Sequence, residues 1–122
     1  MKQIIILNQI PTLLNSLYRP TIRNGKLSIV KDKSAIEFIN YVKLEATRQK
    51  IKLNENNRLS FKCDILIKSR KNYDIYAVLK LLLDSLEGIA YKNDRHIIDL
   101  RVRKHLKAEK DGIDIMIEDI ND

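Results

Sequence analysis

Two aspartates and a lysine are the residues of this chain best suited to phosphodiester chemistry. Asp74 precedes a predicted helix, Lys80 lies on that helix, and Asp94 lies in the loop after it. Mg²⁺ takes hard oxygen ligands, usually one or two carboxylates together with substrate phosphate oxygens. Such an ion lowers the pKa of bound water, and a lysine can stabilise the charge that develops on the phosphate. If the helix ends and the sheet edge face one another, Asp74 and Asp94 can approach one Mg²⁺ or Mn²⁺ ion.

The same residues also have simpler structural interpretations. Aspartate is a common N-cap, so Asp74 can serve only to begin the helix. Lys80 and Asp84 have the spacing of an exposed helical ion pair, which contributes about 0.3 kcal/mol. Asp94 can be a turn residue. Asp84 should lie about 15 Å from Asp74 along an ideal helix, so we do not expect it to share an ion with Asp74.

Two stretches repeat apolar residues at helical spacing. The first begins at a capping box, Ser34 with Glu37, and predicts a helix over residues 34–50. Its predicted buried face is Ala35, Phe38, Ile39, Val42 and Ala46. The second predicts a helix over residues 74–87 with Gly88 as its C-cap. Its predicted apolar face is Ile75, Val78, Leu79, Leu82, Leu83 and Leu86, and its outer stripe is Tyr76, Lys80, Asp84 and Glu87.

Alternating and β-branched runs predict the strands. They cover residues 3–7, 59–67, 97–107 and 113–117, and Asn24-Gly25 predicts a hairpin turn between 21–22 and 27–29. Residues 12–19 are expected to be irregular. In the strand over 97–107, the expected inward residues are Ile98, Leu100 and Val102, and the expected outward residues are Asp99, Arg101, Arg103 and His105. The element order predicts an α+β (mixed α/β) fold in a single domain over 1–122: one mixed β-sheet with two helices packed on it.

Composition narrows the class of protein. The chain has 122 residues, a net charge of +7 and a pI of about 9.5, which favours a polyanionic partner such as nucleic acid. The lone Cys63 lies in an alternating strand, so we expect a buried, inert thiol. No apolar run approaches the ~18 residues of a membrane span, and no secretory signal is evident. A cytoplasmic protein is predicted.

Basic residues gather on both sides of the acidic positions. The candidate DNA contacts are Arg19, Lys68, Arg70, Lys71, Arg101, Arg103, Lys104 and Lys107. Neutralising phosphates with such residues releases counterions and makes binding dependent on salt. No aromatic ladder accompanies them, so a stacking platform for single strands is not favoured. The alternative is a solvated basic surface with no ligand.

The segment 74–86 resembles the signature of RusA-type Holliday-junction resolvases, which is roughly D-x-D-N-x-x-K-x-x-x-D-x-L. Residues 93–97 resemble the acidic D-D-x-Q-[VI] element of that family, with His96 at the glutamine position, and 98–104 resembles its strand ending in lysine. Near the N-terminus, Pro11, Asn15, Tyr18 and Arg19 resemble its P-x-x-x-N-x-x-Y-R segment. The likeness covers most of the chain in the same order.

The resemblance implies a small homodimer that binds four-way DNA junctions and nicks opposed strands with Mg²⁺ or Mn²⁺. It implies that Asp74 is the first metal-binding aspartate, Asp94 the last, and Lys80 the catalytic lysine. Asp84 matches a recurrent helix aspartate of structural role. Resolvases of this type are often carried by phages and prophages.

Three positions depart from the family pattern. The second signature aspartate falls on Tyr76, the asparagine beside it on Ala77, and the first aspartate of the D-D pair on Asn93. Tyrosine is a poor Mg²⁺ ligand because its phenol has a reference pKa of about 10. Three hypotheses therefore stay open: an active junction endonuclease, a related protein that binds branched DNA without cleaving it, and a basic module that binds RNA or another protein.

Overall fold

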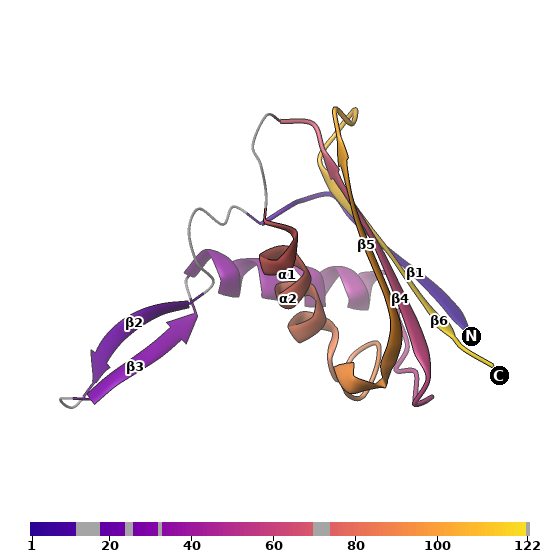
Figure 1. Ribbon diagram of the computed structural model, residues 1–122, viewed down its shortest axis with the longest axis horizontal. Coiled ribbons are helices and arrows are strands. Elements are labelled where there is room, and N and C mark those ends of the chain that lie inside the picture. The colour runs from indigo at the N-terminus through magenta and orange to yellow at the C-terminus, as the bar shows by residue number, and fades with distance from the viewer. Residues whose placement is uncertain (12–17, 24–25, 32, 70–73, 122) are drawn as a thin grey trace.

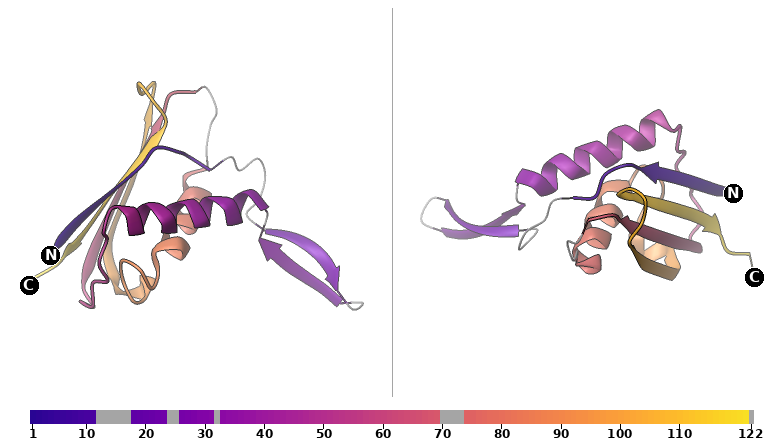
Figure 2. Two further views of the ribbon diagram at one scale, coloured as in Figure 1. Left: turned by 180° about the vertical axis from the view of Figure 1, so that it is seen from behind. Right: turned by 90° about the horizontal axis from the view of Figure 1, so that it is seen from above.

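A four-stranded mixed sheet carries two helices on one face (Figures 1 and 2). The structure is a computed structural model that describes residues 1–11, 18–23, 26–31, 33–69 and 74–121. The sheet order is β1-β6-β4-β5, with β1 (Lys2–Leu7), β6 (Gly112–Asp119), β4 (Leu59–Ile67) and β5 (Ile97–Leu106). β6 runs antiparallel to both of its neighbours, whereas β4 and β5 are parallel. The predicted α+β class, with one mixed sheet and two helices, is confirmed.

The first helix, α1 (Lys33–Arg48), follows its predicted pattern closely. All five of the expected apolar residues are buried, and they lie three or four positions apart. They belong to the same hydrophobic core as the inward residues of β4, which are those that the alternation predicted: Leu59, Phe61, Cys63, Ile65 and Ile67. Cys63 is buried as expected, and its burial raises the pKa of the thiol to about 12.

The second helix, α2 (Ile75–Leu86), buries a face that is rotated about the helix axis from the predicted one. Leu81 and Ser85 are fully buried, while Leu79 and Leu83 are only partly covered. Ser85 tolerates burial because its hydroxyl donates a 2.5 Å hydrogen bond to the carbonyl oxygen of Leu81. The outer stripe, with Tyr76 and Lys80 exposed, stands as predicted.

The edge strand β5 departs from the simple alternation of its sequence. Ile98 and Leu100 were expected to point inward, but they are 53% and 49% exposed. A register shift pairs Leu59 with Ile97 and the next residue of β4 with Asp99, so Ile98 is skipped. Ile97 packs against the core in its place. Leu100 is aligned with buried Phe61, and its exposure reflects the position of β5 at the edge of the sheet.

A two-stranded hairpin projects away from the sheet and helices (Figures 1 and 2). It consists of β2 (Tyr18–Arg23) and β3 (Lys26–Lys31), paired antiparallel. The predicted hairpin is confirmed and is longer than expected, because Tyr18 and Arg19 belong to β2 rather than to an irregular segment. The turn residues 24–25 and the predicted irregular residues 12–17 lie outside the described part of the chain.

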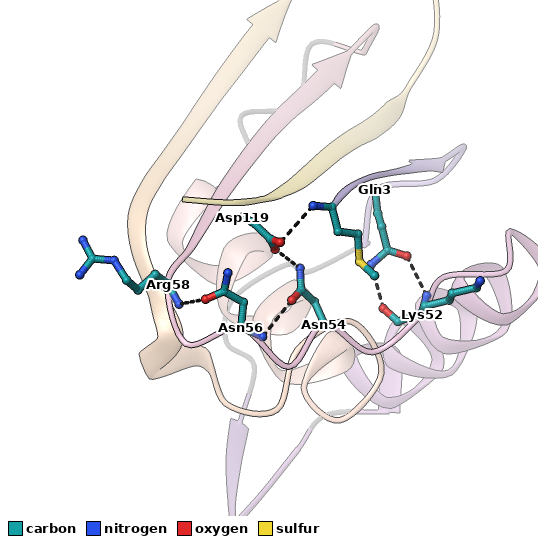
Figure 3. A network of polar contacts seen from close by, with 7 residues as sticks. Gln3, Lys52, Asn54, Asn56, Arg58 and Asp119 are labelled. Atoms are coloured by element: carbon teal, nitrogen blue, oxygen red, sulfur yellow. Dashed lines mark hydrogen bonds and ion pairs between the residues drawn. The ribbon is translucent and has the colours of Figure 1, made fainter. Parts of the chain in front are cut away.

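A polar network ties the end of the sheet to the segment between α1 and β4 (Figure 3). Asp119 accepts hydrogen bonds from the side chain of Asn54 and from the amino group of Met1, the latter at 3.0 Å. Gln3 exchanges two hydrogen bonds with the backbone of Lys52, at 2.8 and 2.7 Å. The pKa of the Asp119 carboxyl is lowered, first by the Asn54 hydrogen bond and then by the amino group.

The crossover from β4 through α2 to β5 sets the position of the predicted site. Because β4 and β5 are parallel, the segment that contains α2 must lead the chain from the C-terminal end of β4 back to the N-terminal end of β5. A short 3-10 helix, η1 (Asp94–His96), leads directly into β5. Within the described residues, no helix has the length and apolar character needed to cross a membrane.

Candidate active site

Asp74 begins α2 as its N-cap. Its Oδ1 accepts hydrogen bonds from the backbone N–H groups of Tyr76, at 2.9 Å, and Ala77, at 3.4 Å. The capping interpretation of Asp74 is therefore confirmed. The residue is also exposed, and its negative charge at a helix N-terminus is favoured by the helix dipole.

Lys80 lies on the outer stripe of α2, in the second turn of the helix after the cap. Its Nζ is 3.9 Å from Oδ2 of Asp84, and the side chain of Lys80 is 54% exposed. The predicted i,i+4 pair is thus present, but at this distance and exposure it contributes little to stability. The side chain of Lys80 is long and half exposed, so its amino group lies at the surface of the helix.

Three more basic residues lie near the C-terminal ends of the parallel strands β4 and β5. Lys68 follows β4, and its backbone N–H donates to Asp111 at 2.8 Å. Lys104 is aligned with buried Ile65 and so occupies the helix-bearing side of the sheet. Lys107 follows β5 with a φ of 58°, which ends the regular strand. We call Lys68, Lys104 and Lys107 the basic edge.

Asp94 lies at the other end of α2. It is the first residue of η1, and Asn93 caps that turn by accepting from the N–H of Arg95 at 3.0 Å. The Tyr91 hydroxyl, near Asp94, donates a 2.6 Å hydrogen bond to the carbonyl oxygen of Leu83 in the last turns of α2. The pKa of Tyr91 is raised by burial first and then by the negative charge of Asp94.

Asp74 and Asp94 lie at the two ends of α2 along the chain. Asp74 caps the start of the helix, whose 12 residues span about 18 Å, and Asp94 follows its end in η1 (Figure 1). Two ligands of one Mg²⁺ ion each lie about 2.1 Å from it. The convergence of the two carboxylates on one ion stays a prediction.

The acidic end of α2 holds residues that the sequence analysis did not treat as a group. The charges of Asp94, Glu87 and Asp84 all raise the pKa of Tyr91, so all three carboxyl groups lie near its hydroxyl. We call these three residues the acidic end. The spacing of Asp84 and Glu87 was a usable signal, but their proximity to Asp94 depends on the fold of residues 88–93.

The remaining predicted DNA contacts fall in different places. Arg101 and Arg103 lie on the open face of the sheet, opposite the helices, beside a shallow hollow of about 340 Å³. Asp64 and Asp114 also line this hollow, so the open face mixes both signs of charge. Arg19 falls in β2, whereas Arg70 and Lys71 lie outside the described residues. Lys104 lies on the side of the sheet that carries α2, since it is aligned with buried Ile65.

His96 and His105 occupy different surroundings. Nδ1 of His96 is buried and has no hydrogen-bond partner among the described residues. His105, expected at the surface, is half exposed on the open face and lies 2.7 Å from Asp64 through Nε2. Neither histidine joins Asp74.

The sequence model of the family described as endodeoxyribonuclease RusA matches residues 16–118. The chain belongs to this family. The match runs from the segment before β2 to the last strand, so it includes both ends of α2 and the projecting hairpin. No curated protein matches the chain.

RusA proteins are Holliday-junction endonucleases that bind branched DNA, and they generally depend on a divalent metal. Tyr76, which the sequence analysis aligned with the second signature aspartate, is 79% exposed. Ala77 is half buried beside it.

Proposed function

We propose that this protein is a structure-specific endonuclease that resolves four-way DNA junctions by hydrolysing phosphodiester bonds. One observation carries the proposal: Asp74 caps α2 and Lys80 lies on the exposed face of the same helix, on the side of the sheet that also holds Lys104. The match to the RusA family gives this arrangement its substrate class. Branched DNA is the partner, and a homodimer is the acting form.

Each residue contributes a separate part of the binding and chemistry. The basic edge would neutralise phosphates and hold the strand near the start of α2. Lys80, whose long side chain is already half exposed, would approach the scissile phosphate and stabilise the charge that develops there. Asp74 is held in place by its two hydrogen bonds to the helix, so its carboxylate is oriented before substrate arrives.

A divalent metal ion at this site would need carboxylate ligands beside Asp74. Among them, no three His, Cys, Asp or Glu side chains form a group that could hold a metal ion. At the start of α2, Tyr76 stands where the family has its second aspartate. A divalent ion would supply a polarised phosphate and an activated water, but Asp74 alone is a weak ligand set for it.

A second candidate function is binding without cleavage. Tyr76, Ala77 and Asn93 favour it, because three polar positions of the family site have changed together. A protein of this kind would keep the basic edge and the scaffold and lose the hydrolytic step. It would still discriminate branched from linear DNA.

The discriminating experiment measures binding and nicking on the same labelled four-way junction, with Mg²⁺ or Mn²⁺, beside a linear duplex at matched salt. Nicking of the junction supports the first candidate. Tight junction binding without nicking selects the second. Equal affinity for junction and duplex removes both.

A double substitution, Tyr76→Asp with Ala77→Asn, sharpens this choice. It restores the signature at the exposed start of α2, where an added carboxylate is favoured by the helix dipole. We expect nicking to rise at least tenfold over the wild type. The matched control is Leu44→Asp, which adds the same charge at a residue of α1 that is 69% exposed. Equal nicking by the control and the double variant would contradict a role for the start of α2.

A further inference from the structure

The open face of the sheet carries apolar residues that no described element covers, because both helices lie on the other face (Figures 1 and 2). Ile4 and Ile6 of β1 are 55% and 50% exposed, whereas Ile5 and Leu7 are fully buried on the helix side. A sheet with one solvated face normally has polar residues on that face. Exposed apolar residues at neighbouring positions of such a face indicate a surface that binds a partner.

The register of the strands arranges the open face in two rows that cross the sheet. From β1 to β5, the first row is Ile4, Met116, Lys62 and Arg101, and the second row is Ile6, Asp114, Asp64 and Arg103. The residues of both rows line the hollow of about 340 Å³. Because neighbouring strands lie about 4.8 Å apart, each row spans about 14 Å.

The first row changes from apolar to basic along its length. Met116 continues the apolar surface of Ile4, and Lys62 and Arg101 follow it with no acidic residue in the row. Methionine and arginine are both enriched at protein interfaces, and arginine can hold a carboxylate through two parallel hydrogen bonds. The row therefore offers an apolar contact at one end and a carboxylate-binding pair at the other.

The second row disfavours nucleic acid as the occupant. Asp114 and Asp64 are directly opposed on neighbouring strands, and Oδ1 of Asp64 lies 2.7 Å from Nε2 of His105. Two carboxylates in the middle of the face would repel the closely spaced phosphates of DNA. The open face also lies across the sheet from α2, which carries the residues of the proposed site.

A second copy of the chain is also a poor match for this face. If a twofold axis related two open faces, the basic end of one copy would meet either the basic end or the apolar end of the other. The first arrangement opposes like charges. The second buries charged groups against apolar side chains without partners, which is costly.

We propose that the open face binds an extended peptide segment of another protein, in which an apolar side chain lies about 10–13 Å from a pair of carboxylates. The apolar side chain packs against Ile4, Ile6 and Met116, and the carboxylates bind Lys62 and Arg101. At about 3.3 Å per extended residue, an advance of three or four residues covers this distance. The inference goes beyond the proposed function, because a protein bound on this face leaves α2 accessible to DNA.

The probe is a synthetic peptide with blocked ends, Ile-Phe-Gly-Gly-Asp-Asp, titrated into the purified protein without DNA and followed by calorimetry. We expect saturable binding that Arg101→Gln weakens about tenfold and Ile4→Thr about fivefold, because each removes one end of the contact. Lys43→Gln is the matched control, since it removes a charge from the exposed side of α1 and should leave binding unchanged.

Two further peptides test the spacing and the charge on the wild-type protein, so that this arm does not depend on the folding of any variant. Ile-Phe-Asp-Asp-Gly-Gly has the same composition with the acids moved, and Ile-Phe-Gly-Gly-Asn-Asn lacks the charges. Each should bind about tenfold more weakly than the first peptide. The absence of saturable binding by the first peptide, or equal affinity for all three, would overturn the proposal.

Two competition measurements examine the other occupants. Displacement of the bound peptide by a four-way junction would mean that DNA occupies the open face. A dimer that Ile4→Thr dissociates in sedimentation would mean that a second copy does, and either result overturns the inference. A protein that binds the first peptide as expected but cuts no junction supports the inference and contradicts only the proposed endonuclease.

Discussion

The hydroxyl of Tyr91 donates a 2.6 Å hydrogen bond to the carbonyl oxygen of Leu83. This bond joins the segment after α2 to the last turns of the helix. The backbone of the same segment is fixed by Gly88, whose N–H donates to the carbonyl oxygen of Tyr91 at 2.7 Å. Tyr91 is fully buried, so it holds the chain that leads to Asp94 against the end of α2.

Tyr91→Phe should lower the free energy of unfolding by about 1 kcal/mol. The loss is modest because the carbonyl oxygen of Leu83 still accepts from the N–H of Glu87. Tyr91→Ala should cost about 3–5 kcal/mol, because it also leaves a cavity in the core. Urea unfolding of both variants checks the prediction. An equal cost for both would mean that the hydroxyl, and not the ring, holds this segment.

Asp74→Asn separates capping from chemistry. Asparagine caps helices about as well as aspartate, so stability should change by less than about 0.5 kcal/mol. Nicking should be abolished, and junction binding should stay equal or become tighter because a negative charge near phosphate is lost. Asp74→Ala should in addition lose about 1 kcal/mol of stability.

Thermal unfolding, junction binding and nicking are measured on both Asp74 variants. The control is Glu55→Gln, which neutralises an exposed acid that pairs with Lys92 at 3.2 Å, away from the start of α2. Weaker junction binding by Asp74→Asn would count against a role for Asp74 at the metal and phosphate.

Salt dependence tests the basic edge. Lys68→Gln and Lys104→Gln should each reduce the slope of log K against log salt by about 0.9, because each removes one phosphate contact. Lys43→Gln, on the exposed side of α1, should leave the slope unchanged. Junction binding at four or more salt concentrations gives the slopes. Equal slopes for all three variants would mean that the strand does not pass along this edge.

The polar network around Asp119 should make stability depend on pH. The pKa of Asp119 is lower in the folded protein than its usual value of 3.8, so its contribution is complete above that value. It is lost as pH falls below 3.8 toward the folded pKa. Asp119→Asn should therefore cost about 1 kcal/mol at pH 7, and the difference from wild type should shrink near pH 3. Urea unfolding at both pH values measures this, with Glu118→Gln as the control.

The helices and most strands could be predicted from local periodicity. The buried residues of α1 and β4 follow spacings that the sequence displays directly. The phase of β5 could not be predicted, because the skipped Ile98 depends on pairing with β4. The rotation of α2 depends on Ser85, whose hydrogen bond within the helix makes a polar residue acceptable in the core.

The sequence names candidate site residues but not their arrangement. The signature identified Asp74, Lys80 and Asp94 as candidates, and the first two lie on α2 and at its N-cap. Their distance from Asp94 follows from the parallel pairing of β4 with β5, which no local pattern in either strand reveals. A crossover helix between parallel strands places the residues before it and the residues after it at opposite ends of the helix.

The strand β6 lies between β1 and β4, although it follows all the other strands along the chain. Lys2 pairs with Glu118, so the two most distant parts of the sequence are neighbours in the sheet. During synthesis, β1 has no neighbouring strand to pair with until β6 has left the ribosome. Assembly of the sheet is consequently a late event, dominated by contacts of long sequence separation, and such chains fold slowly for their size.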